Sequence, residues 1–188
     1  LTLQDDDSEN TDTYLQADYV RPLGAQGKLE VGARLSFRRQ EDDALVRVFE
    51  SSDAADPLET TRSGFRYDET FRSAYATVNR SFGKLGVQLG LRAELASTEF
   101  TVARTGERFE NDYNSIFPSA NISYDLGGGR TIRFSYSKRI GRPWPFILNP
   151  DVPSTDSLNR YVGNPEIRPN YTHSFGLDLS WIGSRGTL

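Results

Sequence analysis

Two stretches of strict alternation constrain the fold of this chain more than any other feature. In residues 29–38 and 85–95, every odd position is apolar, while the even positions are small, polar or charged. This period of two predicts β-strands with one apolar and one polar face. Soluble strands usually have about five or six residues, whereas a tilted strand needs about nine to eleven residues to cross a bilayer. The two stretches therefore predict strands of a membrane β-barrel.

The rest of the chain repeats this pattern more weakly, and no helical period is present. We expect five further strands, near residues 13–21, 71–82, 113–126, 131–140 and 171–181. The fold predicted is all-β, an antiparallel up-and-down barrel wall of about seven strands. After Leu95 the apolar positions change parity to Phe100 and Val102. We expect a bulge or a bend at this point.

The connections between these strands alternate in length. Short turns are expected near 22–27, 83–84, 127–129 and 183–186, and long loops near 1–12, 40–68, 104–112 and 141–170. Antiparallel connectivity places all the long loops on one side and all the short turns on the other. Outer-membrane barrels have this asymmetry, with short periplasmic turns and long extracellular loops. Residues 1–188 are thus predicted to be one barrel domain.

Alternation alone does not say which face meets water, so a soluble β-sandwich remains an alternative. Aromatic residues near the strand ends favour a barrel, because outer-membrane barrels carry aromatic girdles at the membrane interfaces; they are Tyr19, Phe37, Phe82, Tyr124, Tyr171 and Trp181. Single-chain bacterial barrels have an even number of strands. Since the chain also lacks Met and a signal peptide, we expect an excerpt of a larger wall, or an eight-stranded barrel lacking one strand.

Composition excludes some classes of site. The chain has no Cys, which rules out disulfides and thiolate metal sites, and a single His leaves no usual catalytic triad. Its net charge of −4 argues against a nucleic-acid partner. We therefore predict a protein that is not an enzyme, with no catalytic residue and no cofactor.

The second half of the chain carries a family resemblance. Ile116-Phe117-Pro118-Ser119 precedes an alternating strand, a glycine turn and the run from Phe134 to Pro143. Leu148-Asn149-Pro150 and Gly163-Asn164-Pro165-Glu166-Ile167-Arg168-Pro169 follow. This order resembles the barrel of TonB-dependent outer-membrane receptors, most closely the outer-membrane β-barrel family. Asn170 stands where the family pattern usually has Glu.

The resemblance implies a 22-stranded barrel in the outer membrane of a Gram-negative bacterium. It implies active uptake of a siderophore, cobalamin, glycan or peptide, with an N-terminal plug domain and a TonB-contacting motif, neither of which is in these residues. Outer-membrane lipid and lipopolysaccharide are further implied partners. Two alternatives remain open at this point: a small non-transporting barrel used for adhesion or anchoring, and a soluble carbohydrate-binding sandwich.

Two groups of residues are candidates for function. The first is a set of charges on the predicted lumenal face: Glu30, Arg34, Arg38, Arg92, Glu94, Arg133, Arg139 and Asp178. We expect these charges to pair with one another; the alternative is that they line a solute path or hold a plug. The second is Arg142, Trp144, Asn149 and Asn164 in the 141–170 loop. Arg and aromatic side chains suit anionic or glycan ligands, although we expect these residues mainly to shape a proline-stiffened loop.

Three other motifs are expected to be structural. The run Asp5-Asp6-Asp7 lacks the spacing and glycine of a calcium loop, so it is predicted to be solvated. His173 has no second metal ligand nearby and is predicted to lie at the membrane interface. Gly127-Gly128-Gly129-Arg130 is predicted to be a turn, because no helix with a lysine–serine pair follows it.

Overall fold

The computed structural model describes residues 1–151, 161–183 and 186–187. Eight antiparallel strands form a sheet in chain order: β1 (Thr2–Pro22), β2 (Gly27–Val48), β3 (Glu59–Phe82), β4 (Leu85–Val102), β5 (Arg108–Gly127), β6 (Arg130–Gly141), β7 (Asn170–Gly183) and β8 (Gly186–Thr187). A 3-10 turn, η1 (Gly24–Gln26), joins β1 to β2, and a short helix, α1 (Pro145–Leu148), follows β6. In the part of the chain described, neither helical segment is long and apolar enough to cross a membrane.

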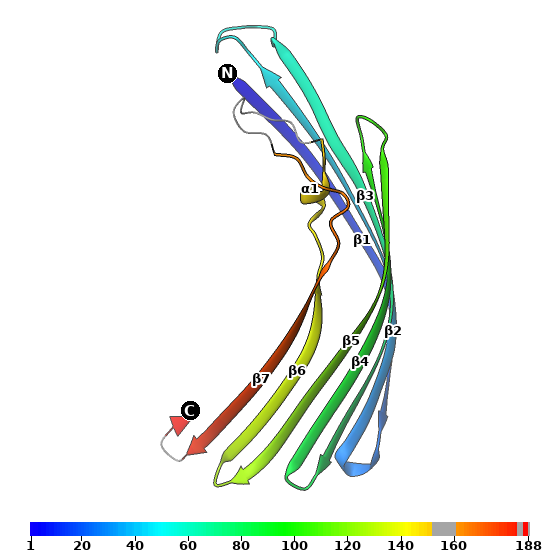
Figure 1. Cartoon of the computed structure of the whole chain (residues 1–188), viewed down its shortest axis with the longest axis vertical. Coiled ribbons are helices and arrows are strands. Elements are labelled where there is room, and N and C mark those ends of the chain that lie inside the picture. Colours follow the sequence, from blue (N-terminus) through cyan, green and yellow to red (C-terminus); the bar gives the residue numbers. More distant parts are fainter. Residues whose placement is uncertain (152–160, 184–185, 188) are drawn as a thin grey trace.

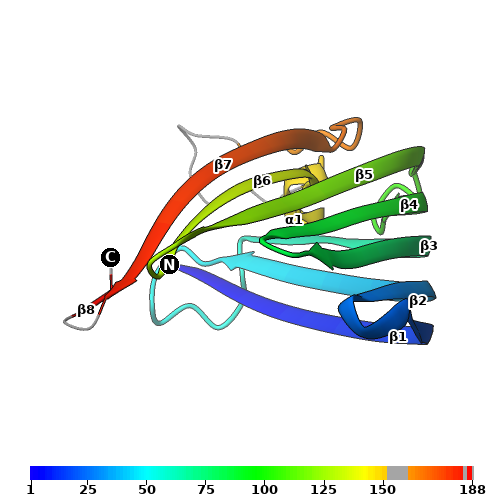
Figure 2. The ribbon, with the colours of Figure 1, turned by 90° about the horizontal axis from the view of Figure 1, so that it is seen from below.

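The sheet is curved, and α1 lies on its concave side (Figure 1). Seen from below, the strands follow one another in chain order from β1 to β7 (Figure 2). The described parts of the β6–β7 connection, residues 142–151 and 161–169, are here called the strap and run along the concave side with α1. All the turns between β1 and β2, β3 and β4, and β5 and β6 lie at the end opposite the strap (Figure 1).

Three of the four predicted loops are shorter in the structure. Residues 1–12 lie mostly in β1, the 40–68 connection is reduced to 49–58, and the 104–112 connection is reduced to 103–107. The β1–β2 ladder continues without a break from Pro22↔Lys28 to Thr2↔Val48. Backbone hydrogen bonds do not require alternating side chains. The strands therefore extend beyond the region where alternation is visible in the sequence.

The predicted bulge after Leu95 is wrong. β4 pairs with β3 in one unbroken register from Leu85↔Phe82 to Val102↔Phe65. Phe100 and Val102 lie in the same row as Glu94, on the concave face, and are almost fully buried there. The change of parity therefore marks the point where the apolar side chains move from the convex face to a core on the concave face.

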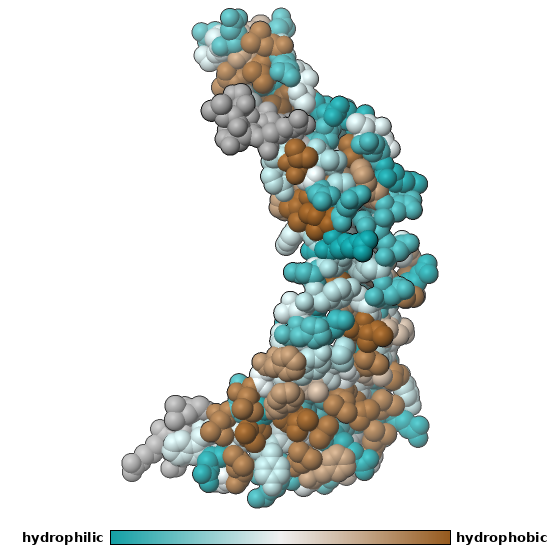
Figure 3. All heavy atoms as spheres, in the orientation of Figure 1, coloured by the Kyte–Doolittle hydropathy of each residue, from teal (hydrophilic) through white to brown (hydrophobic). Residues whose placement is uncertain are grey.

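The convex face carries a continuous apolar band. Directly opposed partners share a face, so the registers place these exposed or half-exposed residues in one set: Leu29, Val31, Leu35, Leu85, Val87, Leu89, Leu91, Leu95, Ile122, Phe134, Leu177 and Leu179. The six predicted girdle aromatics lie in the same rows, and each has at least 40% of its surface exposed. Hydrophobic residues gather in the lower part of the molecule (Figure 3).

Ion pairs replace the apolar residues on the convex face toward the strap end. Arg39 and Arg66 bind the Asp68 carboxylate from two sides, at 2.7 and 2.8 Å. Arg108 on β5 binds Glu99 on β4 at 2.7 Å. These cross-strand pairs explain why residues 39–68 show no hydrophobic period although they are largely strand.

A comparison of two turn glycines tests the packing at the lower end of the sheet. Gly83 and Gly129 both have positive φ, at 62° and 75°. A Cβ on Gly83 meets open space, whereas a Cβ on Gly129 would collide with the Ile182 backbone carbonyl on β7. Gly83→Ala should therefore destabilise the folded protein by about 1 kcal/mol, and Gly129→Ala by roughly 2–4 kcal/mol. Urea titration of the full-length protein folded in lipid vesicles measures both losses, and equal losses would contradict the collision.

Candidate lumenal site and the strap that covers it

The eight predicted lumenal charges all lie on the concave face. The registers connect their rows across the sheet, from Glu30, Arg34 and Arg38 on β2 to Asp178 on β7. Arg38 binds Asp12 at 2.8 Å and approaches Glu69 at 3.7 Å. Arg92 binds Glu94 at 3.1 Å and covers the Phe117 ring at 4.8 Å.

The remaining members of this set differ in their partners. Glu30 binds Lys28 at 3.0 Å, and Arg34 covers the Tyr14 ring at 4.3 Å. Arg133 stands directly opposite Asp178 in the β6–β7 register, and Arg139 stands opposite Thr172. Within the residues that the structure describes, no carboxylate lies within 4.0 Å of the guanidinium of Arg34, Arg133 or Arg139. The concave face thus combines closed ion pairs with three arginines outside them.

Arg142 anchors the strap to the wall. Its Nη2 donates to the Glu94 carboxylate at 2.5 Å, and its Nε donates to the Tyr113 hydroxyl at 3.0 Å. Its guanidinium also covers the Phe71 ring at 4.2 Å. The Arg142 side chain is 27% exposed and that of Glu94 is 10% exposed. Arg142 therefore joins one end of the strap to β3, β4 and β5 at once.

A second polar cluster lies beside this anchor and was missed by the sequence analysis. The Tyr67 hydroxyl donates to Glu69 at 3.0 Å, and both residues are buried. Glu69 also faces Arg38, so it connects the predicted charges on β2 with the wall under the strap. Both Tyr67 and Glu69 fall in the 40–68 stretch or at its boundary, where the sequence showed no strand period. Only the long-range β2–β3 register brings them to the concave face.

The other strap candidates separate into structural and exposed residues. Asn149 is buried, and its side-chain oxygen accepts the Asp151 backbone N–H at 3.0 Å. The Asn164 side chain accepts the Glu166 N–H at 2.9 Å in the same way. Trp144 differs, because 72% of its surface is exposed. Of the four candidates, Trp144 and Asn164 are therefore exposed, whereas Asn149 is buried and Arg142 is half-buried.

An apolar cluster holds α1 against the concave wall. Leu148 of α1 packs with Phe65, Tyr67, Phe100 and Val102, and Phe109 lies at its margin. The Phe65 and Phe100 rings are stacked with centroids 5.1 Å apart.

Two polar contacts secure the strap further along its length. The Asn111 side chain on β5 donates to the Pro165 carbonyl at 3.2 Å. Arg104 forms a two-bond ion pair with Asp151, and this carboxylate raises the pKa of the Arg104 guanidinium. The strap is therefore a packed layer on the inner wall rather than a free loop.

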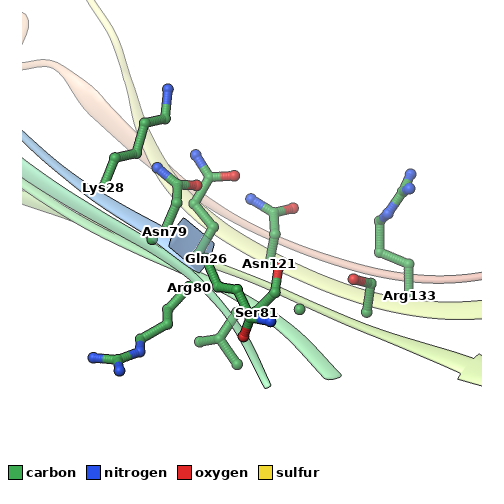
Figure 4. Close-up of a pocket in the computed structure, with 12 residues that line it drawn as sticks. Gln26, Lys28, Asn79, Arg80, Ser81, Asn121 and Arg133 are labelled. Atoms are coloured by element: carbon green, nitrogen blue, oxygen red, sulfur yellow. The ribbon is translucent and has the colours of Figure 1, made fainter. Parts of the chain in front are cut away.

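A polar hollow lies at the opposite end of the concave face, near the short turns. It has a volume of about 640 Å³, within the usual range for ligand pockets, but its lining is mostly polar. Figure 4 shows the side chains of Lys28, Asn79 and Asn121 on one side of the sheet, whereas Arg80 points away from them. Arg133 lies at the edge of this hollow.

The structure also places the three motifs that were expected to be structural. Asp5, Asp6 and Asp7 lie in β1, not in a loop, and alternate between its two faces, so their carboxylates do not converge. No group of His, Cys, Asp or Glu side chains in the described ranges is arranged to hold a metal ion. His173 lies on the convex face and contacts Tyr136. Gly128 and Gly129 form the β5–β6 turn with positive φ.

Comparison with known proteins identifies the family. Residues 1–187 match the model of the outer membrane protein β-barrel family. The chain belongs to this family. Its place in the outer membrane of a Gram-negative bacterium follows, and the predicted all-β barrel wall is confirmed. The soluble sandwich is therefore excluded, and the convex apolar band is the lipid-facing side of this family member.

Solved structures share the fold at low sequence identity. The ferric citrate transporter FecA in its unliganded form has a TM-score of 0.64 and 14% identity, covering 96% of this chain and 26% of that protein. The copper transporter OprC has a TM-score of 0.61 and 16% identity, covering 97% and 29%. The siderophore receptor PiuA from Acinetobacter baumannii has a TM-score of 0.59 and 15% identity, covering 96% and 30%. The chain thus spans less than a third of each structure. No curated protein sequence matches it significantly.

Proposed function

We propose that this outer-membrane β-barrel chain is part of the wall of a TonB-dependent uptake receptor. In this proposal the complete barrel has 22 strands, a plug domain fills its lumen, and the strap end faces the cell exterior. The lumen then carries solute, and the chain performs no catalysis. The long strap on the inner wall is the observation that carries the proposal.

The strap favours a wide barrel over the small adhesin or anchor barrel. The interior of an eight-stranded barrel is just wide enough for side chains to fill it. Here the concave face holds a helix, an apolar cluster and a polar hollow of about 640 Å³. A helix and an apolar cluster packed on the inner wall need more room than the interior of an eight-stranded barrel provides. This favours the wider lumen of a transporter.

A siderophore-type metal chelate is the substrate class best supported by the lumenal charges. Arg34, Arg133 and Arg139 lie on the concave face, and in the described part of the chain none has a carboxylate within 4.0 Å. Guanidinium groups of this kind suit anionic chelates, because they form charge-assisted hydrogen bonds to carboxylates. The structures with the same fold include a ferric citrate transporter and a siderophore receptor. Cobalamin, glycans and peptides are the other candidate substrates.

Replacing a lumenal arginine tests the transport function directly. Arg133→Ala in the full-length protein should reduce uptake of radiolabelled ferric citrate about tenfold at limiting concentration, because a charge-assisted contact is lost. Copper is the second solute to assay. Arg80→Ala on the convex face is the matched control and should leave uptake unchanged. Both variants must reach the outer membrane in normal amount.

Two results would contradict the proposal. Uptake by Arg133→Ala equal to that of the parent protein would exclude Arg133 from the solute path. If solute accumulates equally in cells with and without TonB, energy-coupled uptake by this protein is excluded, and the non-transporting barrel is favoured.

A further inference from the structure

The ladder between β5 and β6 ends halfway up the sheet. The two strands pair from Gly127↔Arg130 to Ser119↔Ser137, and no further pair is formed although β5 continues to Arg108. Pro118 is the next residue of β5 and has no N–H to donate, so it ends the ladder. Above this point β6 pairs only with β7. The wall therefore forks, and two strand edges face one another without pairing.

A tyrosine from β7 spans this fork. The Tyr171 hydroxyl lies 2.6 Å from Ser115 Oγ on β5, so the side chain crosses the end of β6. Lys138 Nζ lies 4.7 Å from the centre of the Tyr171 ring. In the described ranges no carboxylate lies within 4.0 Å of this ammonium group. Lys138 is thus a cation at the rim of the fork, with an aromatic partner and no ion pair.

The surroundings of Lys138 belong to the lipid-facing side. Its cross-strand partner is His173, which contacts the Tyr136 hydroxyl at 3.0 Å through Nδ1. When Nδ1 accepts this hydroxyl, Nε2 carries the hydrogen and is free to donate outward. Directly below, Phe175 packs on Tyr136 with ring centres 4.9 Å apart and is 72% exposed. Lys138 and His173 therefore form a polar row between the Tyr136–Phe175 row below and the Ile140–Tyr171 row above.

Two cations nearer the strap end of the convex face are arranged differently. Arg66 and Arg108, further toward the strap end on β3 and β5, each lie within 4.0 Å of carboxylates. Their charge is neutralised by the protein itself. The charge of Lys138 is not. In the described ranges the same holds for Arg72, but Lys138 also has the Tyr171 ring beside it and His173 across the strand pair. This arrangement attracts an anionic group attached to hydrocarbon chains.

We propose that Lys138, Tyr171 and His173 bind a phosphate of outer-leaflet lipopolysaccharide, with its acyl chains lying on the apolar band below. Lysines at a membrane surface attract anionic headgroups, and aromatic rings settle at the interface. The continuity with the apolar band selects a lipid over free phosphate. The assignment to the outer leaflet rests on the orientation in the proposed function.

Native mass spectrometry of the full-length protein, titrated with lipopolysaccharide in detergent, tests this site. Lys138→Gln should weaken binding about fivefold, and His173→Gln should weaken it in the same direction. Arg80→Gln is the matched control, because Arg80 also lies over an aromatic ring, that of Phe82 at 5.3 Å, but at the opposite margin of the band. Lipopolysaccharide with its lipid A phosphates removed should bind the parent protein as weakly as it binds the Lys138→Gln variant. Inorganic phosphate at equal concentration should not compete.

Two outcomes would overturn the site. One is equal binding by Lys138→Gln and the parent protein, and the other is equal loss in Lys138→Gln and Arg80→Gln. Orientation is measured separately with Ser52→Cys in the 49–58 connection, with the parent protein lacking this substitution as the background for labelling. A membrane-impermeant maleimide should label intact cells. Labelling only after the outer membrane is broken would overturn the orientation, and with it the proposed outer-leaflet site. Ferric citrate uptake by the Lys138→Gln variant should equal that of the parent protein, so the lipid site and the proposed transport function are tested independently.

Discussion

Replacing Arg142 by alanine is expected to release the strap from the inner wall. The change removes two hydrogen bonds, to Glu94 and Tyr113, and leaves the Glu94 carboxylate almost buried without its cation on the strap. Because Arg92 still binds Glu94 at 3.1 Å, losing the Arg142 contacts costs about 2 kcal/mol. The barrel strands keep their ladders, so the loss should appear as local opening of residues 142–151 and 161–169. Backbone amides there should exchange with solvent about 30-fold faster.

Hydrogen exchange with mass spectrometry on the full-length protein measures this opening. Arg139→Ala is the matched control, because Arg139 is three residues away and has no ion pair in the described residues. If the strap amides exchange at the same rate in the Arg142→Ala and Arg139→Ala variants, the Arg142 contacts do not hold the strap.

Placing an arginine at position 89 is expected to block folding in the membrane, whereas the same residue at position 88 should be tolerated. Leu89 lies near the centre of the convex band and is 51% exposed, while Gln88 lies on the concave face at the polar hollow. An arginine facing lipid near the bilayer midplane costs about 2–4 kcal/mol. Leu89→Arg should therefore lower the ratio of folded to unfolded protein about 30-fold or more.

The folded fraction in lipid vesicles, measured against urea, gives this ratio for both variants. The two positions are adjacent in sequence, so strand propensity and insertion order are the same for each. A larger loss for Gln88→Arg than for Leu89→Arg would invert the assignment of the two faces. Retained folding by Leu89→Arg would show that the convex band does not meet hydrocarbon.

Sequence predicted the strands best where one face meets lipid and the other meets the lumen. Residues 29–38 and 85–95 alternate strictly. They lie in β2 and β4, with the odd positions on the convex face and the even positions on the concave face, as predicted. Residues 1–12 and most of 40–68 are strand as well, yet were predicted as loops. There, cross-strand ion pairs such as Arg39–Asp68 and a buried concave core remove the two-residue period while the backbone ladder continues.

The sequence by itself determined the strand type, the two-faced wall and the family, because period-two alternation and the ordered motif from Ile116 to Pro169 are local. Only the tertiary structure decided what Arg142 and Glu69 do. Arg142 meets Glu94 across 48 residues, and Tyr67 and Glu69 come under the strap only through the register of β2, β3 and β4. Side-chain pairing across such distances depends on register and curvature, and no local pattern encodes these.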